Sequence, residues 1–316
     1  MRNKIVVIFT LIVLIIIESC LLGLTLLNKE ENELAVANTK ASISVSAQSG
    51  IPALSLIGPL TSPEYNLETD IVHDEQELVT AFDNNVSDLI IAPINLGLEQ
   101  VKNGANYKML GIVSWGNAEI VGSAERYDEI AIYDEQGVIG TMLDKFHSEI
   151  GTKIVYNSFE SQSEVADALL SDTYSTGVLT EPMLIKVKSS YISSHEDEEL
   201  KVKFSLSELF EEETGYENYP VYAFFVNNDL VENDYITIVN FISNLSISIE
   251  TFNQDSSKLA NLPIDIEQLG FNSLDFLIEA YPNFSLNYLY VTECKDAVNA
   301  YLKMFGMSLN DDNYVK

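Results

Sequence analysis

From residue 51 onward, short runs of apolar residues alternate with longer stretches in which apolar residues recur every three or four positions. Short apolar runs bounded by Gly, Pro, Asn or Asp are typical of buried strands, and the longer period is typical of amphipathic helices. Alternation of these two patterns along a chain predicts an α/β fold.

The first part of this pattern predicts three strands and one helix. Strands are expected over residues 53–57, 87–92 and 107–122, the last of them broken at residues 114–117. Residues 74–85 carry apolar side chains at helical spacing between the first two strands. These elements indicate a first lobe.

A second group of elements follows the break. Strands are expected over residues 129–133, 153–156 and 176–179, and helices over residues 138–150 and 160–171 separate them. A β-α-β-α-β unit of this kind forms a sheet of its own.

The apolar run over residues 220–226 can carry the chain back to the first lobe, after which the pattern is mostly helical. We therefore predict that residues 50–112 with residues 221–316 form lobe one and that residues 113–220 form lobe two. No internal repeat of fixed period is visible.

Residues 1–27 have a different character. Arg2 and Lys4 supply two positive charges, and Thr10 is the only residue of 5–17 that is not strongly apolar. A charged start followed by an apolar stretch is typical of an export signal.

Two forms of membrane attachment are compatible with the residues that follow. Ser19 and Cys20 fit the site at which a bacterial lipoprotein is cleaved and lipidated, but Glu18 departs from that pattern. The apolar stretch continues to Leu27, which is also long enough to span a bilayer uncleaved. Either form predicts attachment at the outer face of the cell membrane, with residues 28–49 as a flexible tether.

Charge and composition narrow the kind of partner. The formal charge is −31, from 48 acidic residues against 17 Lys and Arg, which argues against nucleic acid and indicates a solvated, monomeric protein. After Arg2 the only arginine is Arg126. Because arginine is the usual clamp for carboxylates, sulfonates and phosphates, we expect a neutral, aromatic or cationic small-molecule ligand.

The reactive residues do not form a recognisable catalytic set. Cys20 would lie at the membrane boundary and Cys294 in the folded part, so the two cysteines do not indicate a disulfide framework. The three His residues are scattered without metal-ligand spacing. No Gly-x-Ser-x-Gly elbow occurs, and the spacing of Gly137 and Gly140 is too short for a phosphate loop. We expect no metal, no cofactor and no enzymatic activity.

Loops at the ends of the predicted strands are the candidate binding region. In open α/β sheets, ligands bind beyond the carboxyl ends of the strands, where helix N-termini present free N–H groups. The loops after residues 57, 92, 113, 133 and 179 all occupy this position. Trp115 or a nearby Tyr could stack on a ligand there.

Several of these segments resemble the substrate-binding proteins of bacterial ABC importers in the nitrate, sulfonate and taurine class. The resemblance lies in residues 92–97, residues 107–117, Thr180-Glu181-Pro182, Tyr219-Pro220 and residues 269–302. The Ser-Trp-Gly-Asn stretch within the second segment is the most specific part.

This resemblance covers nearly all of residues 50–305, and it implies a two-lobed type II periplasmic-binding fold. The two lobes would be joined by two crossover segments, and a ligand would be enclosed in the cleft between them and delivered to a membrane permease. Carried over position by position, the binding site comprises Gly58, Pro59, Thr61, Ser62, Pro93, Asn95, Ser114, Trp115, Asn117, Asp134, Gln136, Gly137 and Glu181. Asn95, Trp115, Asn117 and Glu181 are the expected side-chain contacts.

Two other functions use related folds. A surface sensor or adhesin could reuse the binding fold without a permease. An enzyme related to thiamine-pyrimidine synthases would need a His-based, Cys-rich active region, which this sequence lacks. The same class of importers includes receptors for pyrimidine precursors of thiamine, so the shortage of Arg favours an aromatic or neutral ligand over a sulfonate.

Overall fold

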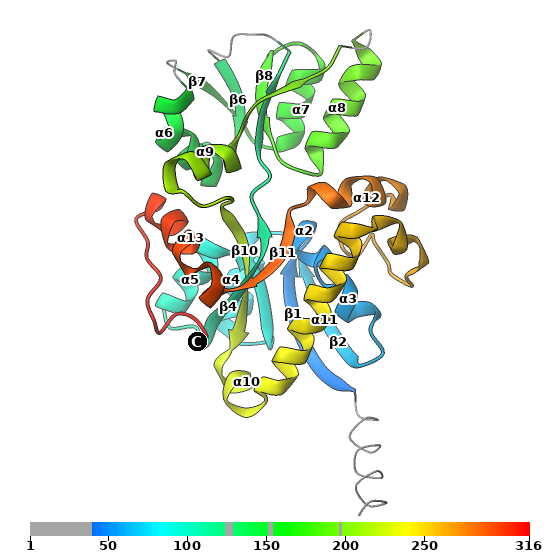
Figure 1. The fold of residues 1–316 in the computed structure, drawn as a ribbon, viewed down its shortest axis with the longest axis vertical. Helices are drawn as coiled ribbons and strands as arrows, with labels where there is room; N and C mark the ends of the chain where they lie inside the picture. The colour runs from blue at the N-terminus through cyan, green and yellow to red at the C-terminus, as the bar shows by residue number, and fades with distance from the viewer. Residues whose placement is uncertain (1–39, 124–128, 151–153, 196–197) are drawn as a thin grey trace, which may run out of the picture. The chain divides into compact units, whose positions relative to one another are not determined.

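The computed structural model describes residues 40–123, 129–150, 154–195 and 198–316 (Figure 1). The predicted signal or anchor over residues 1–27, the lipidation candidate Cys20 and the single arginine Arg126 of the mature part lie outside these ranges. Within the described residues, no helix combines the length and the apolar character needed to cross a membrane.

The larger of two sheets has six strands. They are β1 (Ala41–Gln48), β2 (Tyr65–Val72), β3 (Leu89–Pro93), β4 (Tyr107–Trp115), β10 (Pro220–Asn227) and β11 (Leu286–Tyr290), in the order β11-β4-β10-β3-β1-β2. Strand β10 runs antiparallel to both β3 and β4, whereas β1 and β3 are parallel. The chain thus returns to this sheet through β10 and inserts it between two earlier strands.

The second sheet has five strands. They are β5 (Glu119–Gly122), β6 (Glu129–Tyr133), β7 (Val155–Phe159), β8 (Thr176–Leu179) and β9 (Lys201–Ser205), in the order β7-β6-β8-β5-β9. Strand β6 is parallel to β7 and β8, and β5 is antiparallel to β8 and β9. The predicted α/β class with two lobes, each built on its own sheet, is confirmed.

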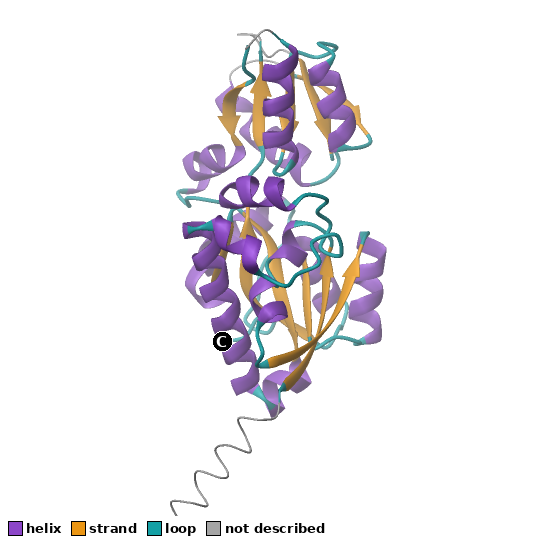
Figure 2. Ribbon diagram, turned by 90° about the vertical axis from the view of Figure 1, so that its right-hand side faces the viewer, coloured by secondary structure: helices purple, strands orange, loops and turns teal. Residues whose placement is uncertain are grey.

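Helices lie on both sides of the sheets (Figure 2). The α-helices are α2 (Ile51–Leu54), α3 (Ile57–Thr61), α4 (Glu75–Asn84), α5 (Ile94–Lys102), α6 (Val138–Ile150), α7 (Gln162–Leu170), α8 (Met183–Ser194), α9 (Leu206–Thr214), α10 (Asn228–Asn233), α11 (Tyr235–Gln254), α12 (Leu274–Ala280) and α13 (Val291–Met304), with 3-10 turns η1 (Ser256–Asn261) and η2 (Tyr281–Asn283). Asp74 and Ser161 begin α4 and α7 by accepting backbone N–H bonds, as N-cap residues do.

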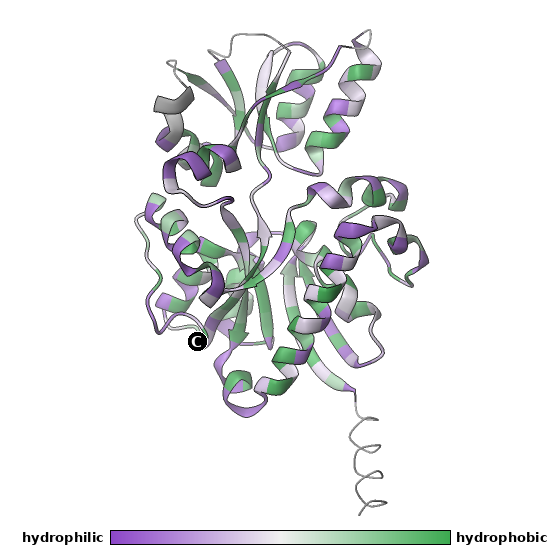
Figure 3. Cartoon of the chain, viewed as in Figure 1, coloured by the Kyte–Doolittle hydropathy of each residue, from purple (hydrophilic) through white to green (hydrophobic). Residues whose placement is uncertain are grey.

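The chain passes between the two sheets twice, once from β4 to β5 and once from α9 to β10 (Figure 1). These two crossings are hydrogen-bonded to each other, because the N–H of Gly116 donates to the carbonyl of Tyr219 at 2.8 Å. One apolar core includes Phe225 of β10, Tyr219 of the second crossing and Phe210 of α9. Figure 3 shows the hydrophobic residues concentrated along the strands.

The start of the first lobe differs from the sequence prediction. Residues 41–48 form strand β1 instead of a flexible tether, and residues 53–57 lie in helices α2 and α3 and the turn between them instead of a strand. Ile43 and Val45 are fully buried, and the intervening serines are satisfied by distant partners, so a segment of polar appearance becomes a central strand. The apolar run at 53–57 is buried on all sides. A short run of this kind occurs in buried helices as well as in buried strands, so its pattern does not distinguish the two.

Candidate ligand-binding site

At the carboxyl edge of the six-stranded sheet, Tyr222 of β10 connects three neighbouring strands. It lies opposite Pro93 of β3 and opposite Ser114 of β4 in the strand register. Its hydroxyl donates to Oε1 of Gln48, the last residue of β1, at 3.0 Å. The structure therefore brings the predicted residues Pro93 and Ser114 together and adds Gln48 and Tyr222, which the sequence reasoning missed.

Asn95 lies in the first turn of α5, directly after β3. Its Oδ1 atom is buried and has no hydrogen-bond partner among the described residues. A buried acceptor without a partner costs about 1–3 kcal/mol. Such an atom is suited to accept a hydrogen bond from a ligand N–H or O–H group.

Asp134 ends β6 in the other sheet with a left-handed backbone, at φ 59°. Its carboxylate accepts a hydrogen bond from the N–H of Ile139 at 3.3 Å, and its carbonyl accepts from Gly137 and Gly140. Burial raises the pKa of this carboxyl group above its ordinary value. The N-terminus of α6 is therefore occupied by a carboxylate of the chain itself.

The carboxylate of Glu181 occupies the N-terminus of helix α8 in the same way. Its Oε2 accepts a hydrogen bond from the N–H of Ile185 at 3.1 Å. Burial raises the pKa of Glu181, while the bond from Ile185 and the charge of Lys188 oppose that rise. Helix N-termini are common anion sites. In lobe two, the N-termini of α6 and α8 already hold the carboxylates of Asp134 and Glu181.

Tyr301 of α13 stacks on Tyr219 of the second crossing, with 6.3 Å between the ring centroids. Burial raises the pKa of Tyr133, Tyr219, Tyr222 and Tyr301, to about 12 for Tyr222. Asp134 adds to the rise for Tyr133, the last residue of β6, and for Tyr301 of α13. This region is aromatic and carries a negative charge.

A cavity of about 480 Å³, here called the crossing cavity, lies where the two crossings meet lobe two. Its lining includes Asn117, Glu119, Glu181, Lys188, Ser207 and Asn218. Nζ of Lys188 pairs with Glu119 at 3.2 Å, so Glu119, Glu181 and Lys188 together carry one more negative charge than positive charge. Asn117 and Glu181, both predicted, therefore share one cavity, whereas Lys188 and Asn218 were missed.

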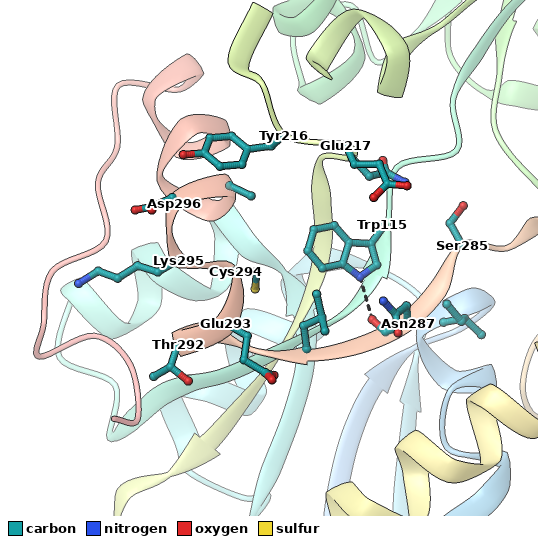
Figure 4. A pocket seen from close by; sticks show the side chains of 14 residues that line it. Trp115, Tyr216, Glu217, Ser285, Asn287, Thr292, Glu293, Cys294, Lys295 and Asp296 are labelled. Carbon is teal, nitrogen blue, oxygen red and sulfur yellow. Dashed lines mark hydrogen bonds between the residues drawn. The ribbon is translucent and has the colours of Figure 1, made fainter. Parts of the chain in front are cut away.

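Trp115 lies in a different cavity, of about 510 Å³, here called the Trp115 cavity (Figure 4). The side chain is 8% exposed, and its Nε1 donates to the carbonyl oxygen of Asn287 at 2.8 Å. The predicted Trp115 and Asn117 are thus separated, although only Gly116 lies between them in the chain.

The remaining predicted residues fall in two places. Gly58, Pro59, Thr61 and Ser62 do not follow a strand: they belong to α3 or its end, and a Cβ on Gly58 would lie 2.1 Å from Oγ of Ser248 in α11. These four residues were predicted to bind ligand because they would follow a strand, and the structure removes that reason. Gln136 is exposed, and Gly137 is closely packed because a Cβ there would lie 1.9 Å from Oδ1 of Asp134.

Few of the described residues are suited to bind a metal ion or to act as a reactive thiol. The described residues contain no group of three or more His, Cys, Asp or Glu arranged to hold a metal ion. Cys294 is buried in α13, and burial raises the pKa of its thiol to about 12.

Comparison with known proteins finds neither a matching family nor a matching curated protein. Solved structures do match. An ABC transporter protein from Parabacteroides distasonis is 16% identical, with a TM-score of 0.73 over 88% of this chain and 99% of that one. The ligand-binding component of an ABC-type import system from Staphylococcus aureus, with zinc bound, is 14% identical, with a TM-score of 0.60 over 88% and 97% of the two chains.

An alkanesulfonate-binding protein from Xanthomonas axonopodis pv. citri, bound to MOPS, is 14% identical, with a TM-score of 0.55 over 85% and 94% of the two chains. The fold is therefore that of the substrate-binding proteins of ABC importers. The resemblance inferred from the sequence is confirmed at the level of the fold.

Proposed function

We propose that this chain is the extracytoplasmic solute-binding protein of an ABC importer, which captures a small molecule between two lobes and delivers it to a membrane permease. The observation that carries the proposal is the arrangement of two α/β sheets joined by two crossings, with a cavity at the crossings lined by Asn117, Asn218 and Glu181. The fold shared with an ABC transporter protein, with the ligand-binding component of an ABC-type import system and with an alkanesulfonate-binding protein supports it.

Capture would work by lobe closure. Lobe one would comprise strand β1 together with residues 50–112 and 221–316, and lobe two would comprise residues 113–220. A ligand that contacts both lobes only in the closed state shifts the equilibrium toward that state. The permease would then distinguish loaded from empty protein by lobe geometry.

The ligand we infer is neutral, aromatic or cationic. Asp134 and Glu181 occupy the N-termini of α6 and α8, where an anionic ligand would otherwise receive N–H bonds. An anion would also meet the charge of both carboxylates. Tyr133, Tyr222 and the free Oδ1 of Asn95 suit an aromatic ring that carries hydrogen-bond donors.

Attachment at the outer face of the cell membrane completes the proposal, through a lipid on Cys20 or through an uncleaved N-terminal helix. Mass spectrometry of the mature protein distinguishes these forms, because cleavage and lipidation would make Cys20 the first residue with a defined mass increase. A mature chain that begins elsewhere and carries no apolar leader would contradict both forms.

The binding function is tested by a metabolite screen with thermal denaturation. A ligand that binds only the folded chain raises the midpoint temperature of unfolding. At a free ligand concentration one hundred times the dissociation constant, the folded state gains about 2.7 kcal/mol. Asn117→Ala and Glu181→Gln should each reduce the shift, whereas Asn261→Leu on the surface should not. Chemical conversion of the bound compound would instead favour an enzyme, and binding of a compound whose uptake by the cell does not require this chain would favour a sensor or adhesin.

A further inference from the structure

The Trp115 cavity has features that the capture of solute at the crossing cavity does not use. It is lined by Trp115, Tyr216, Glu217, Asn287, Cys294 and Asp296, among others, and both crossings contribute to it. The two cavities share Asn218 and Ser285 at their border, but Asn117 and Glu181 line only the crossing cavity. A volume of about 510 Å³ is within the range of small-molecule sites.

The wall of this cavity is aromatic and held in place. The indole N–H of Trp115 is already satisfied by the carbonyl of Asn287, so the ring offers its apolar and π surface to an occupant. Figure 4 shows the indole in the middle of the site, with Tyr216 and Glu217 beside it. Aromatic faces attract cations and apolar groups, and Trp does so most strongly.

The charges at the rim are acidic and largely unpaired. Neither Glu217 nor Asp296 has a hydrogen-bond or ion-pair partner in the described ranges. The one Lys in the lining, Lys295, donates to Asp311 at 2.9 Å and to the hydroxyl of Tyr314 at 2.9 Å, and Figure 4 shows it extending away from Trp115. A positive group beside Trp115 would therefore meet the carboxylate of Glu217 without a competing cation among the lining residues.

We propose that the Trp115 cavity is a second binding site, for an organic cation whose positive charge is balanced by Glu217 and whose apolar part packs on Trp115. The site is separate from the crossing cavity, and it stands whether or not the chain serves an importer. An occupant would touch both crossings, because Trp115 belongs to the first and Glu217 to the second.

The probe for this site is benzyltrimethylammonium chloride, titrated into the full chain in detergent micelles. Trp115 is the only Trp, so its emission reports on this cavity directly, and calorimetry measures affinity independently. We expect a saturable change in emission with the ammonium compound and none with sodium benzenesulfonate at the same ionic strength. Glu217→Gln should weaken binding about fivefold, because it removes a charge near the ligand.

Three further variants make the test specific. Glu99→Gln removes an exposed carboxylate from α5 and should leave the affinity unchanged, as should Glu181→Gln in the crossing cavity. Trp115→Phe, followed by calorimetry, should weaken binding about threefold while the thermal midpoint shows that the chain still folds.

Absence of a saturable signal in the unmodified chain would overturn the proposal. Equal weakening by Glu99→Gln and Glu217→Gln would also overturn it, because the effect would then reflect net charge alone. Loss of binding in Glu181→Gln but not in Glu217→Gln would assign the cation to the crossing cavity instead.

Discussion

Gly116 and Tyr219 hold the two crossings together. The N–H of Gly116 donates to the carbonyl of Tyr219 at 2.8 Å, and the Tyr219 hydroxyl accepts a hydrogen bond from the N–H of Ala118 at 3.3 Å. A Cβ added to Gly116 would lie 2.0 Å from the Tyr219 ring, so the close approach requires glycine. Gly116 lines the crossing cavity, and its neighbour Trp115 lines the Trp115 cavity.

Gly116→Ala should therefore destabilise the protein by about 1–3 kcal/mol, because the added methyl group displaces the buried ring of Tyr219. The free energy of unfolding, measured by chemical denaturation, tests this. Ser193→Ala on the exposed side of α8 is the control and should change stability by less than about 0.5 kcal/mol. Equal stability of the Gly116→Ala variant and the unmodified chain would show that the crossings tolerate a wider separation.

Glu181 should make stability depend on pH. Since burial raises its pKa in the folded state, folding favours the protonated form. The stabilisation is complete below the ordinary pKa of the group and is lost as the pH rises through the folded value. In Glu181→Gln, which keeps an acceptor for the N–H of Ile185, this loss should disappear.

The measurement for Glu181 is the free energy of unfolding of both chains between about pH 4 and about pH 8. The unmodified chain should lose stability relative to the Glu181→Gln variant as the pH increases. A difference that is constant over this interval would contradict the prediction.

Asn95→Leu should separate stability from binding. The substitution removes a buried acceptor that lacks a partner, so the free energy of unfolding should be unchanged or higher by about 1 kcal/mol. Ligand-induced stabilisation should fall, because the acceptor for the ligand is gone. Denaturation with and without the compound found by the screen measures both effects, and Asn261→Leu at the surface is the matched control. A strongly destabilised Asn95→Leu variant would falsify the assignment of Asn95 to the ligand.

Cys294 should resist alkylation. Burial raises its pKa to about 12, so only about one thiol in ten thousand is ionised near pH 8, and the thiolate is the reactive form. Iodoacetamide labelling of the Cys294 peptide, followed by mass spectrometry, should be slow in the native chain and fast in urea. Comparable rates in the two conditions would mean that the start of α13 opens readily.

Local periodicity was sufficient for much of the fold. The buried strand β3, the amphipathic helix α4 and the return strand β10 all lie where their apolar patterns predict. These patterns work because burial on one face or on both faces leaves a repeat in the local sequence. The α/β class and the two sheets follow from the order of such elements.

Strand β1 shows where this reasoning fails. The hydroxyls of Ser44 and Ser46 are satisfied by Asp88 and by Ser87, more than forty residues away. Nothing within residues 41–48 signals that partner, so the serines favoured a solvated tether. The apolar residues that follow are plainly buried from their sequence, but their helical form is decided by packing of α2 against β3 and β4 and of α3 against α11.

The candidate site depended still more on the tertiary structure. Sequence position and family resemblance were enough to select Asn117, Glu181 and Trp115, but not to separate them into two cavities. Tyr222 meets Gln48 across 174 positions, and Trp115 meets Asn287 across 172. Contacts at such separations arise from strand order and register, which are set by the packing of the whole sheet and not by the residues adjacent to either partner.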